Sequence, residues 1–178
     1  MSKTIYYVAS SADGYIADRE NRIDWLLAFG FETFNAHYQR FLAGIGAVVM
    51  GASTYEFLLA EDEGWAYDLP AWVFTHRELA PIARADIRFT AASVTEVHEA
   101  AMEAAGGRDV WMIGGGDIAA QFADAGLLDE FHVTVMPVLL GAGRPVLPVS
   151  SAPVPLTLLE TTPFEGGAIE LRYTVGKR

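Results

Sequence analysis

The stretch VWMIGGGDIAAQF, residues 110–122, decides how the rest of the chain is interpreted. It begins as an apolar strand, stops at the glycines Gly114–Gly116, and continues as a helix whose first residues include Asp117 and Ile118. Glycines let a backbone approach a ligand because no Cβ stands in the way, and the free N–H groups of a helix start favour an anion. A tight turn would need only one glycine. Three in a row therefore favour an anion-binding loop, although the stretch is neither a G-x-G-x-x-G motif nor a P-loop.

Strand-like apolar runs alternate with helix-like segments along the whole chain. Ser93 and Glu96 form a capping box, so the helix after them is the clearest one. Near the end, two alternating runs flank a turn at Phe164–Gly167 and are typical of a β-hairpin. The expected strands are Thr4–Ala9, Ala47–Met50, Trp72–Thr75, Ile87–Phe89, Asp109–Ile113, Glu130–Val138, Leu156–Thr162 and Ala168–Val175. The expected helices are Thr33–Ala43, Thr54–Leu59, Ser93–Ala105 and Asp117–Ala125. Ser10–Ile23 is expected to be a loop. This order predicts one α/β domain over residues 1–178, with a mostly parallel central sheet, helices on both faces and an antiparallel C-terminal hairpin.

The composition excludes several classes of function. The 178 residues carry a formal net charge of −11, which disfavours a nucleic-acid partner. There is no cysteine and the 4 histidines have no ligand-like spacing, so we expect neither disulfides nor a metal site. No apolar run has membrane-spanning length, and the N-terminus does not resemble a signal peptide. We therefore expect a cytoplasmic protein with no membrane partner.

A second strand-to-helix turn follows Met50. Gly51 ends the strand, and Ser53 or Thr54 can cap the next helix, where hydroxyl and N–H groups could hold a pyrophosphate. A plain helix cap is the simpler interpretation of this turn taken alone. The pattern Gly-x-Ser also suggests the nucleophile elbow of a hydrolase, but that turn needs a second glycine where Tyr55 stands. We therefore rank a hydrolase low.

Two further segments fall beyond the carboxyl ends of expected strands, which is where such sheets bind ligands. Thr75, His76 and Arg77 follow one strand, and an arginine can pair with a phosphate through two hydrogen bonds. Strand-end arginines also commonly face water. The loop after the first strand contains Asp13-Gly14, which is a turn signal.

Together these segments resemble the dihydrofolate-reductase-like superfamily, and most closely the bacterial branch that includes the reductase domain of the riboflavin-biosynthesis deaminase–reductase. The likeness spans nearly the whole chain, and the set of motifs is more specific than any one of them. The matching segments are Ser10–Ala17 to the S-x-D-G-x-I-A motif, Val49–Glu56 to M-G-R-x-T-Y-E, Val73–Arg77 to the strand before the adenosine phosphate, Ile113–Gly116 to the glycine triplet, and Leu127–Glu130 with Met136–Gly143 to L-D-E…P-x-L-L-G-x-G.

The resemblance implies a dihydrofolate-reductase-like three-layer fold that binds NADPH. It implies reduction of a small pterin- or pyrimidine-like heterocycle, in the manner of 5-amino-6-(5-phosphoribosylamino)uracil reductase. It also implies a homodimer, and a cis peptide bond between Gly114 and Gly115. The implied cofactor contacts are Ala9 and Ile16 at the nicotinamide, Gly51, Ser53, Thr54, Gly114, Gly115, Gly116, Asp117 and Ile118 at the pyrophosphate, and Thr75, His76 and Arg77 at the 2′-phosphate.

The chain also departs from the pattern of this family. Ala52 stands where the pattern has an arginine, and Asp117 adds a carboxylate at a helix start, so the preference for NADPH over NADH stays open. Gly30 occupies the position of the folate-protonating carboxylate of true dihydrofolate reductases. No arginine lies between Pro70 and Trp72 to bind a glutamate tail. We therefore expect no dihydrofolate reductase activity, and the lack of cysteine leaves no deaminase zinc site.

Position within the resembled fold gives the substrate-side candidates. Asp24 is the first candidate for the proton donor, and Glu32 is the second. Trp25, Tyr55 and Thr134 are candidate substrate contacts.

Two other interpretations stay open. A binding protein that has kept the groove and lost the chemistry would be consistent with Ala52 and Gly30. A scaffold would use the apolar run Val133–Leu140 and the hairpin as a dimerising edge. Binding and oxidation of NADPH distinguish these interpretations from the reductase.

Overall fold

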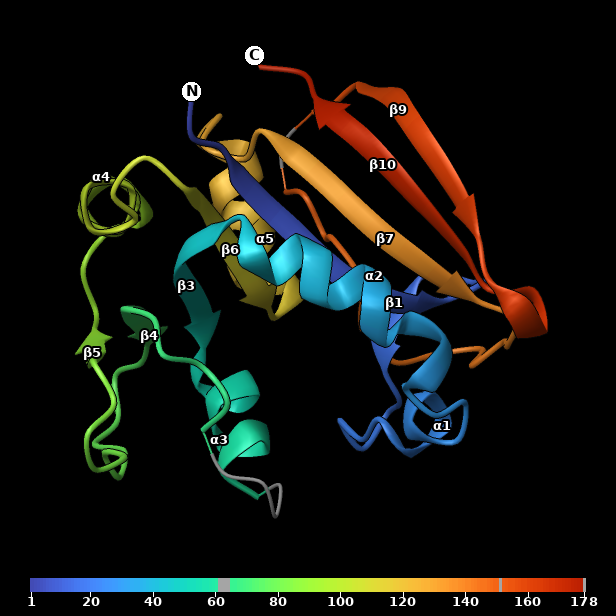
Figure 1. Ribbon diagram of the computed structural model, residues 1–178, viewed down its shortest axis with the longest axis horizontal. Helices are drawn as coiled ribbons and strands as arrows, with labels where there is room; N and C mark the ends of the chain where they lie inside the picture. The colour runs from blue at the N-terminus through green and yellow to red at the C-terminus, as the bar shows by residue number, and fades with distance from the viewer. Residues whose placement is uncertain (61–64, 151, 178) are drawn as a thin grey trace.

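The computed structural model describes residues 1–60, 65–150 and 152–177, and an eight-stranded sheet forms its centre (Figure 1). The strand order is β5-β4-β3-β6-β1-β7-β10-β9. The strands from β5 to β7 run parallel, whereas β10 is antiparallel to both β7 and β9. The bounds are β1 Thr4–Ser11, β3 Ile45–Gly51, β4 Ala71–Phe74, β5 Ile87–Thr90, β6 Asp109–Gly114, β7 Glu130–Met136, β9 Leu156–Pro163 and β10 Ile169–Val175. The predicted parallel sheet with a C-terminal hairpin is confirmed.

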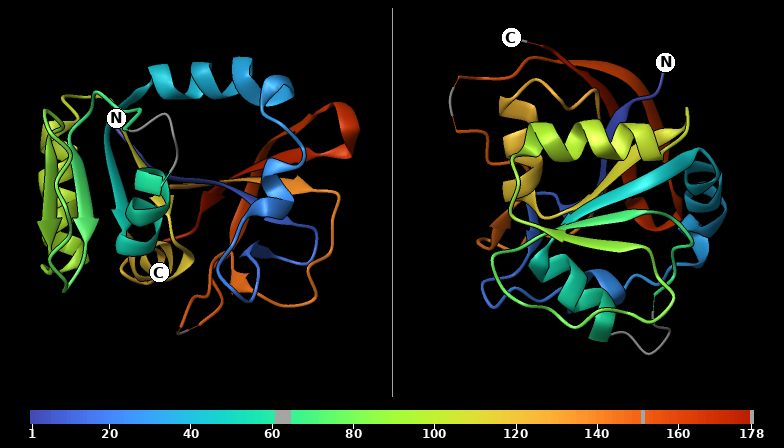
Figure 2. Two further views of the ribbon diagram at one scale, coloured as in Figure 1. Left: turned by 90° about the horizontal axis from the view of Figure 1, so that it is seen from below. Right: turned by 90° about the vertical axis from the view of Figure 1, so that its left-hand side faces the viewer.

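Helices cover both faces of the sheet and give the protein three layers, with α2 and α5 on opposite sides (Figure 2). On one face, α4 and α5 pack against the sheet through buried side chains that include Val97 and Phe122. On the other face, α2 and α3 contribute Phe41 and Tyr55 to a second cluster around Trp111 of β6. The helices are α1 Asp24–Leu27, α2 Glu32–Ala43, α3 Ala52–Ala60, α4 Val94–Ala104 and α5 Gly116–Asp124.

Local sequence explains several of these elements. All side chains of β3 from Ile45 to Met50 are buried, because neighbouring strands and helices surround a central parallel strand. α4 begins at the predicted capping box, which is confirmed. There the Glu96 N–H donates to Ser93 Oγ over 3.3 Å, and the Ser93 N–H donates to Glu96 Oε2 over 3.0 Å.

A second, two-stranded sheet joins segments that are far apart in the sequence. β2 (Tyr15–Ala17) pairs antiparallel with β8 (Arg144–Pro145), so the expected loop over Ser10–Ile23 contains a strand. The close approach needs a glycine at position 143, because a Cβ there would lie 2.0 Å from the backbone oxygen of Ala17. The second half of the chain is thereby attached to the loop after β1.

The hairpin of β9 and β10 turns through the short 3₁₀ helix Glu165–Gly167, within the turn that the sequence predicts. β7 ends at Met136, two residues before the expected end. Within the described part of the chain, no helix combines the length and the apolar character needed to cross a membrane.

Candidate functional site

Two strand-to-helix turns face each other at the carboxyl edge of the sheet. Gly51 ends β3 and Gly114 ends β6, and in these neighbouring strands Met50 is paired with Gly114. A Cβ added at Gly51 would lie 3.4 Å from Ile118 Cγ1, and one added at Gly114 would lie 3.4 Å from Thr54 Oγ1. The backbones of the two turns therefore lie close together, because a side chain at either glycine would contact a residue of the other turn.

We refer to Gly51–Thr54 together with Gly114–Ile118 as the glycine cradle. Both α3 and α5 begin within it, so backbone N–H groups from two helix starts occur at one edge of the sheet. Ser53 is exposed, and so is Asp117, whose carboxylate adds negative charge in the first turn of α5. The peptide bond between Gly114 and Gly115 is cis, as predicted.

A groove of about 290 Å³ continues from the cradle toward β4 and β5. Ile118 and Gln121 of α5 contribute to its lining, and Thr75 and His76 contribute from the turn after β4. The remaining lining residues are Phe74, Thr90, Ala91, Ala92, Ser93 and Val94. The structure thus brings Thr75 and His76 into the same groove as the cradle residue Ile118.

Arg77 belongs to the same turn, in which Thr75 Oγ1 accepts the Arg77 N–H over 2.9 Å. The guanidinium is engaged with Glu56 of α3, with 2.9 Å between Nη2 and Oε2, and this pairing raises the pKa of Arg77. The two side chains are 61% and 43% exposed. A phosphate would therefore compete with Glu56 for Arg77.

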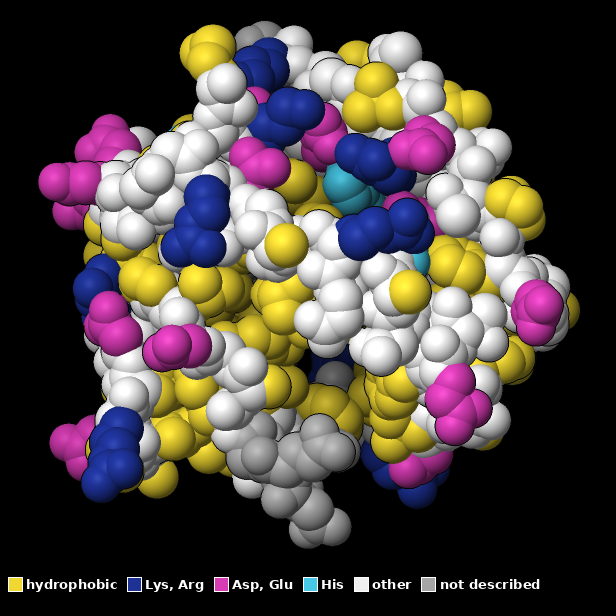
Figure 3. All heavy atoms as spheres, viewed as in Figure 1, with side chains coloured by type: hydrophobic (Ala, Val, Ile, Leu, Met, Phe, Trp, Pro, Cys, Tyr) yellow, Lys and Arg dark blue, Asp and Glu magenta, His cyan; other side chains and the backbone are white. Residues whose placement is uncertain are grey.

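The other end of the cradle meets β1, β2 and β7. Ile16 of β2 borders it, since a Cβ at Gly115 would lie 4.0 Å from Ile16 Cδ1. Ala9 of β1 is paired with Thr134 of β7, which is buried. The surface is hollowed between α3 and α1, below α2, and hydrophobic side chains border the hollow (Figure 3).

The predicted acid residues lie at the outer rim of this region. The Asp24 side chain is 80% exposed, with a carboxylate oxygen 4.0 Å from Arg22 Nε. Glu32 is exposed in the first turn of α2. The indole N–H of Trp25 differs from both, because it is buried without a hydrogen-bond partner among the described residues.

Tyr55 is not brought to the site, so its expected role as a substrate contact is corrected. It is fully buried in the core beneath α3, where its ring packs edge-on against Trp65 and Phe89. Its hydroxyl donates to the backbone oxygen of Ala80 over 2.6 Å. Tyr55 therefore anchors the segment after β4.

Sequence reasoning missed a buried polar cluster that borders Thr134. Glu170 of β10 is paired with Thr134 across the sheet and is 1% exposed. His37 Nε2 of α2 lies 2.9 Å from its carboxylate, and the Tyr7 phenol of β1 interacts with both Thr134 and Glu170. His37 and Glu170 are 133 positions apart in the sequence, so no local motif would have revealed the pair.

A larger cavity of about 560 Å³ lies elsewhere. It is lined by residues 65–70 and 82–86, which precede β4 and β5 and thus lie toward the amino ends of these strands. None of the predicted site residues lines it, so we do not connect it with the cradle.

A family model described as "RibD C-terminal domain" matches residues 2–169. The uncharacterized protein YwjB of Bacillus subtilis (strain 168) is 33% identical over 173 residues, which cover 96% of this chain and 97% of YwjB.

Three solved structures share the fold. A putative riboflavin biosynthesis protein from Shewanella sp. PV-4 superposes with a TM-score of 0.82 and 23% identity, covering 98% of this chain and 99% of that one. A pyrimidine reductase-like protein from Corynebacterium diphtheriae gives a TM-score of 0.73 at 14% identity, with coverage of 99% and 93%. Dihydrofolate reductase from Enterococcus faecalis, complexed with NADP(H), gives 0.63 at 14% identity, with coverage of 97% and 96%. The fold is therefore dihydrofolate-reductase-like.

Proposed function

Because the chain belongs to the family of RibD C-terminal domains, we propose that it is an NADPH-dependent reductase of a small pyrimidine- or pterin-like heterocycle. Membership supports a reductase-like protein, and the relatedness to a pyrimidine reductase-like protein and to a dihydrofolate reductase supports the class of substrate. The observation that carries the proposal is the glycine cradle, together with the groove that continues from it.

The residues of this chain suit an extended dinucleotide. Gly51, Ser53 and Thr54 would hold the pyrophosphate from the side of α3, and Gly114–Ile118 would hold it from the side of α5. A Cβ at Gly51 would occupy space between the two turns, so the cradle depends on bare backbone. The groove past Ile118 would take the adenosine, with Thr75, His76 and Arg77 at its 2′-phosphate.

At the other end of the cradle, Ala9 and Ile16 would orient the nicotinamide, which supplies a hydride when NADPH is bound. Trp25 and Thr134 would contact the heterocycle, and the buried Trp25 N–H would donate to one of its acceptor atoms. The chain itself contributes binding, orientation and exclusion of water. Asp24 and Glu32 stay candidates for the proton donor, and a role for either requires that its amide variant lose turnover.

A second candidate function is a dinucleotide-binding protein without turnover. Two observations favour it: the arginine of the family pattern is replaced by Ala52, and Arg77 is engaged by Glu56. Both lower the positive potential available to the cofactor phosphates in a chain whose net charge is −11.

The experiment separates binding from chemistry. Purified protein is titrated with NADPH and with NADH to measure binding. NADPH oxidation is then followed with a panel of pterins and pyrimidines. The pyrimidines include compounds of the 5-amino-6-(5-phosphoribosylamino)uracil type, in the form that a reductase would accept. Saturable binding with oxidation supports the reductase, and tight binding without oxidation by any compound supports the binding protein. Lack of binding to either nucleotide refutes both.

We also propose a homodimer. β9 is an outermost strand of the sheet and exposes three leucines, Leu156 at 42%, Leu158 at 53% and Leu159 at 51%. An exposed, apolar edge strand is prone to pair with another chain, and a second copy of the same edge is the simplest partner.

A further inference from the structure

Glu170 is a buried carboxylate next to the proposed nicotinamide end of the site. It sits on β10 opposite Thr134 of β7, and Thr134 is in turn opposite Ala9 of β1. Only 1% of its side chain is exposed. A buried carboxylate is costly unless hydrogen bonds or charges satisfy it, so its place two strands away from Ala9 calls for an explanation.

His37 of α2 partners this carboxylate. Its Nε2 lies 2.9 Å from each carboxylate oxygen but is aligned for a hydrogen bond with Oε1. Oε2 is left buried without a well-aligned hydrogen-bond partner among the described residues. The imidazole is 22% exposed and packs edge-on against Phe164 of the hairpin turn, so it joins the buried carboxylate to water.

Tyr7 extends the pair toward Thr134. Its phenol interacts with the Thr134 and Glu170 side chains. Burial first, and then the charge of Glu170, raise the pKa of Tyr7, so the phenol stays protonated and can donate a hydrogen bond. Imidazole, carboxylate and two hydroxyls from four different elements thus form one polar cluster, which the His37 ring joins to the surface.

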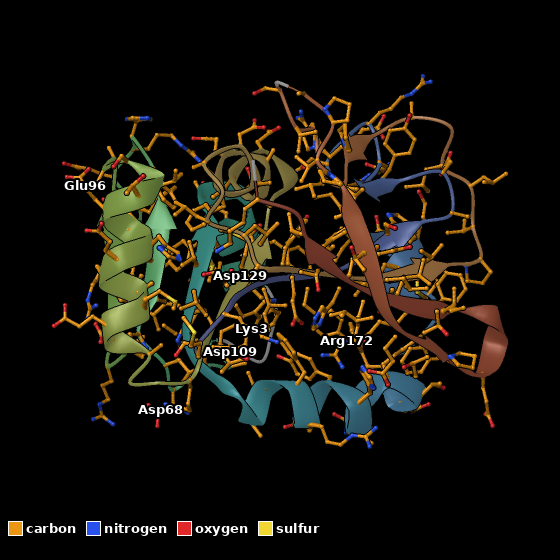
Figure 4. The ribbon with its side chains drawn as sticks, turned by 90° about the horizontal axis from the view of Figure 1, so that it is seen from above. Lys3, Asp68, Glu96, Asp109, Asp129 and Arg172 are labelled. Atoms are coloured by element: carbon orange, nitrogen blue, oxygen red, sulfur yellow. The ribbon has the colours of Figure 1, made fainter. Side chains whose placement is uncertain are left out.

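The charged groups nearby do not account for Glu170. On the same face of the sheet, Glu130 is engaged by Lys3, by His132 and by Arg172, and Arg172 also pairs with Glu160 of β9. Charged side chains gather over β7 and β10 (Figure 3), and Lys3 and Arg172 lie on the side of the sheet that faces α2 (Figure 4). His132 adds a weak electrostatic contribution from β7, but the only ion-pair partner recorded for Glu170 in the described structure is His37.

This choice of partner suggests a chemical role. A lysine or arginine would hold Glu170 as a permanent anion, whereas an imidazole can pass a proton to a carboxylate across a hydrogen bond such as the 2.9 Å contact between His37 Nε2 and Oε1. We propose that the Glu170–His37 pair supplies the proton that the reduction consumes, through the hydroxyls of Tyr7 and Thr134. This inference rests on the reductase function proposed above.

The balance of the reaction is simple. When NADPH is bound, it would supply a hydride to the carbon of a C=N or C=O bond and become NADP⁺, and the π electron pair of that bond would move to the heteroatom. The heteroatom would take one proton that comes from Glu170 by way of the two hydroxyls. His37 then returns a proton to the pair from water. In this scheme Glu170 and His37 do not touch the substrate, and their proton reaches it through the two hydroxyls.

The test compares the wild type with Glu170→Gln, which keeps the side-chain shape but cannot carry the proton. NADPH oxidation is measured across a range of pH with a heterocycle that the wild type reduces, and NADPH binding is measured by tryptophan fluorescence. We expect kcat to fall about 100-fold or more and the loss of activity at alkaline pH to disappear, with the NADPH Kd changed by less than about twofold. Glu160→Gln is the matched control on the adjacent strand, and it is expected to behave as the wild type.

The outcomes separate the two proposals. If the wild type neither binds NADPH nor oxidises it with any compound of the panel, the reductase proposal fails and this inference fails with it. If the wild type is active and Glu170→Gln has the same kcat and the same pH profile, only this inference is overturned. Should Glu170→Gln lose NADPH binding because it does not fold, His37→Gln carries the test. For that variant we expect reduced kcat and an altered alkaline limb with NADPH binding retained, and an unchanged profile would overturn the inference.

Discussion

The carboxylate of Asp13 accepts the backbone N–H of Gly141 over 2.7 Å, although the two residues are 128 positions apart in the sequence. It also accepts the N–H of Leu140 over 3.1 Å and the hydroxyl of Ser11 over 2.6 Å. The turn after β1 is thereby attached to the segment after β7. Because Ile16 follows this turn and borders the cradle, Asp13 helps to fix one wall of the proposed site.

Asp13 predicts a specific dependence of stability on pH. The hydrogen bond from Ser11, followed by that from Leu140, lowers the pKa of Asp13 below its ordinary value of 3.8. The unfolded chain therefore binds a proton at this residue more readily, so the stabilisation is present above the ordinary pKa and is lost as pH falls through the lower folded value. Between about pH 5 and about pH 3 we expect the melting temperature of Asp13→Asn to fall less steeply than that of the wild type. Asp68→Asn, at an exposed position, should keep the wild-type slope, and parallel curves for Asp13→Asn and the wild type would contradict this role.

The Arg77–Glu56 pair predicts a variant that binds NADPH more tightly. Removing the carboxylate in Glu56→Gln frees the guanidinium for the 2′-phosphate, so we expect the NADPH Kd to decrease by about two- to fivefold. The Kd for NADH, which lacks that phosphate, should not change. Arg77→Gln should weaken NADPH binding and leave NADH binding unaltered. If Glu56→Gln changes both affinities equally, Arg77 does not read the 2′-phosphate.

Two glycines of the same strand should respond differently to substitution. At Gly46 a Cβ would lie 2.2 Å from the backbone oxygen of Ala105, so Gly46→Ala should lose about 1–3 kcal/mol of stability by overpacking. At Gly51 the nearest atom would be Ile118 Cγ1 at 3.4 Å, which is ordinary contact. Gly51→Ala should therefore keep the wild-type melting temperature and lose NADPH affinity, because its methyl group enters the cradle. If Gly51→Ala bound NADPH as tightly as the wild type, the cofactor phosphates would have to bind outside the glycine cradle.

The exposed edge of β9 predicts the oligomeric state. We expect sedimentation at micromolar concentration to give a homodimer, and Leu158→Lys to give a monomer because a charge on an edge strand opposes pairing. Leu59→Lys, at an exposed leucine of α3, serves as the control and should leave the dimer intact. A monomeric wild type, or a dimer that withstands Leu158→Lys, would contradict the proposed edge.

The fold was predictable wherever the signal is local. A buried strand that stops at glycine before a helix identifies both turns of the cradle, and the capping box of Ser93 and Glu96 fixes the start of α4. The pairing of β2 with β8 was not predictable, because each partner is too short for a periodic pattern and the contact depends on Asp13 and Gly141 meeting across the fold. Tyr55 fits a family motif in sequence, and only packing shows that it belongs to the core.

The buried polar cluster around Glu170 shows why the site was only partly predictable. In β10 the alternation of Ile169, Leu171 and Tyr173 would place Glu170 on the polar, outward face. Instead Glu170 is buried and Ile169 is exposed, because His37 of α2 lies over the face that contains the carboxylate. Whether α2 covers this face of β10 depends on where a distant helix packs. The alternation of residues within one strand does not reveal the position of that helix.

Equilibrium titration of the wild-type protein with NADPH, followed by tryptophan fluorescence, tests the glycine cradle most directly. We expect saturable binding of one nucleotide per chain, which Gly51→Ala weakens at unchanged melting temperature. A fluorescence signal that does not saturate up to about 1 mM of NADPH or NADH would mean that the cradle binds no dinucleotide.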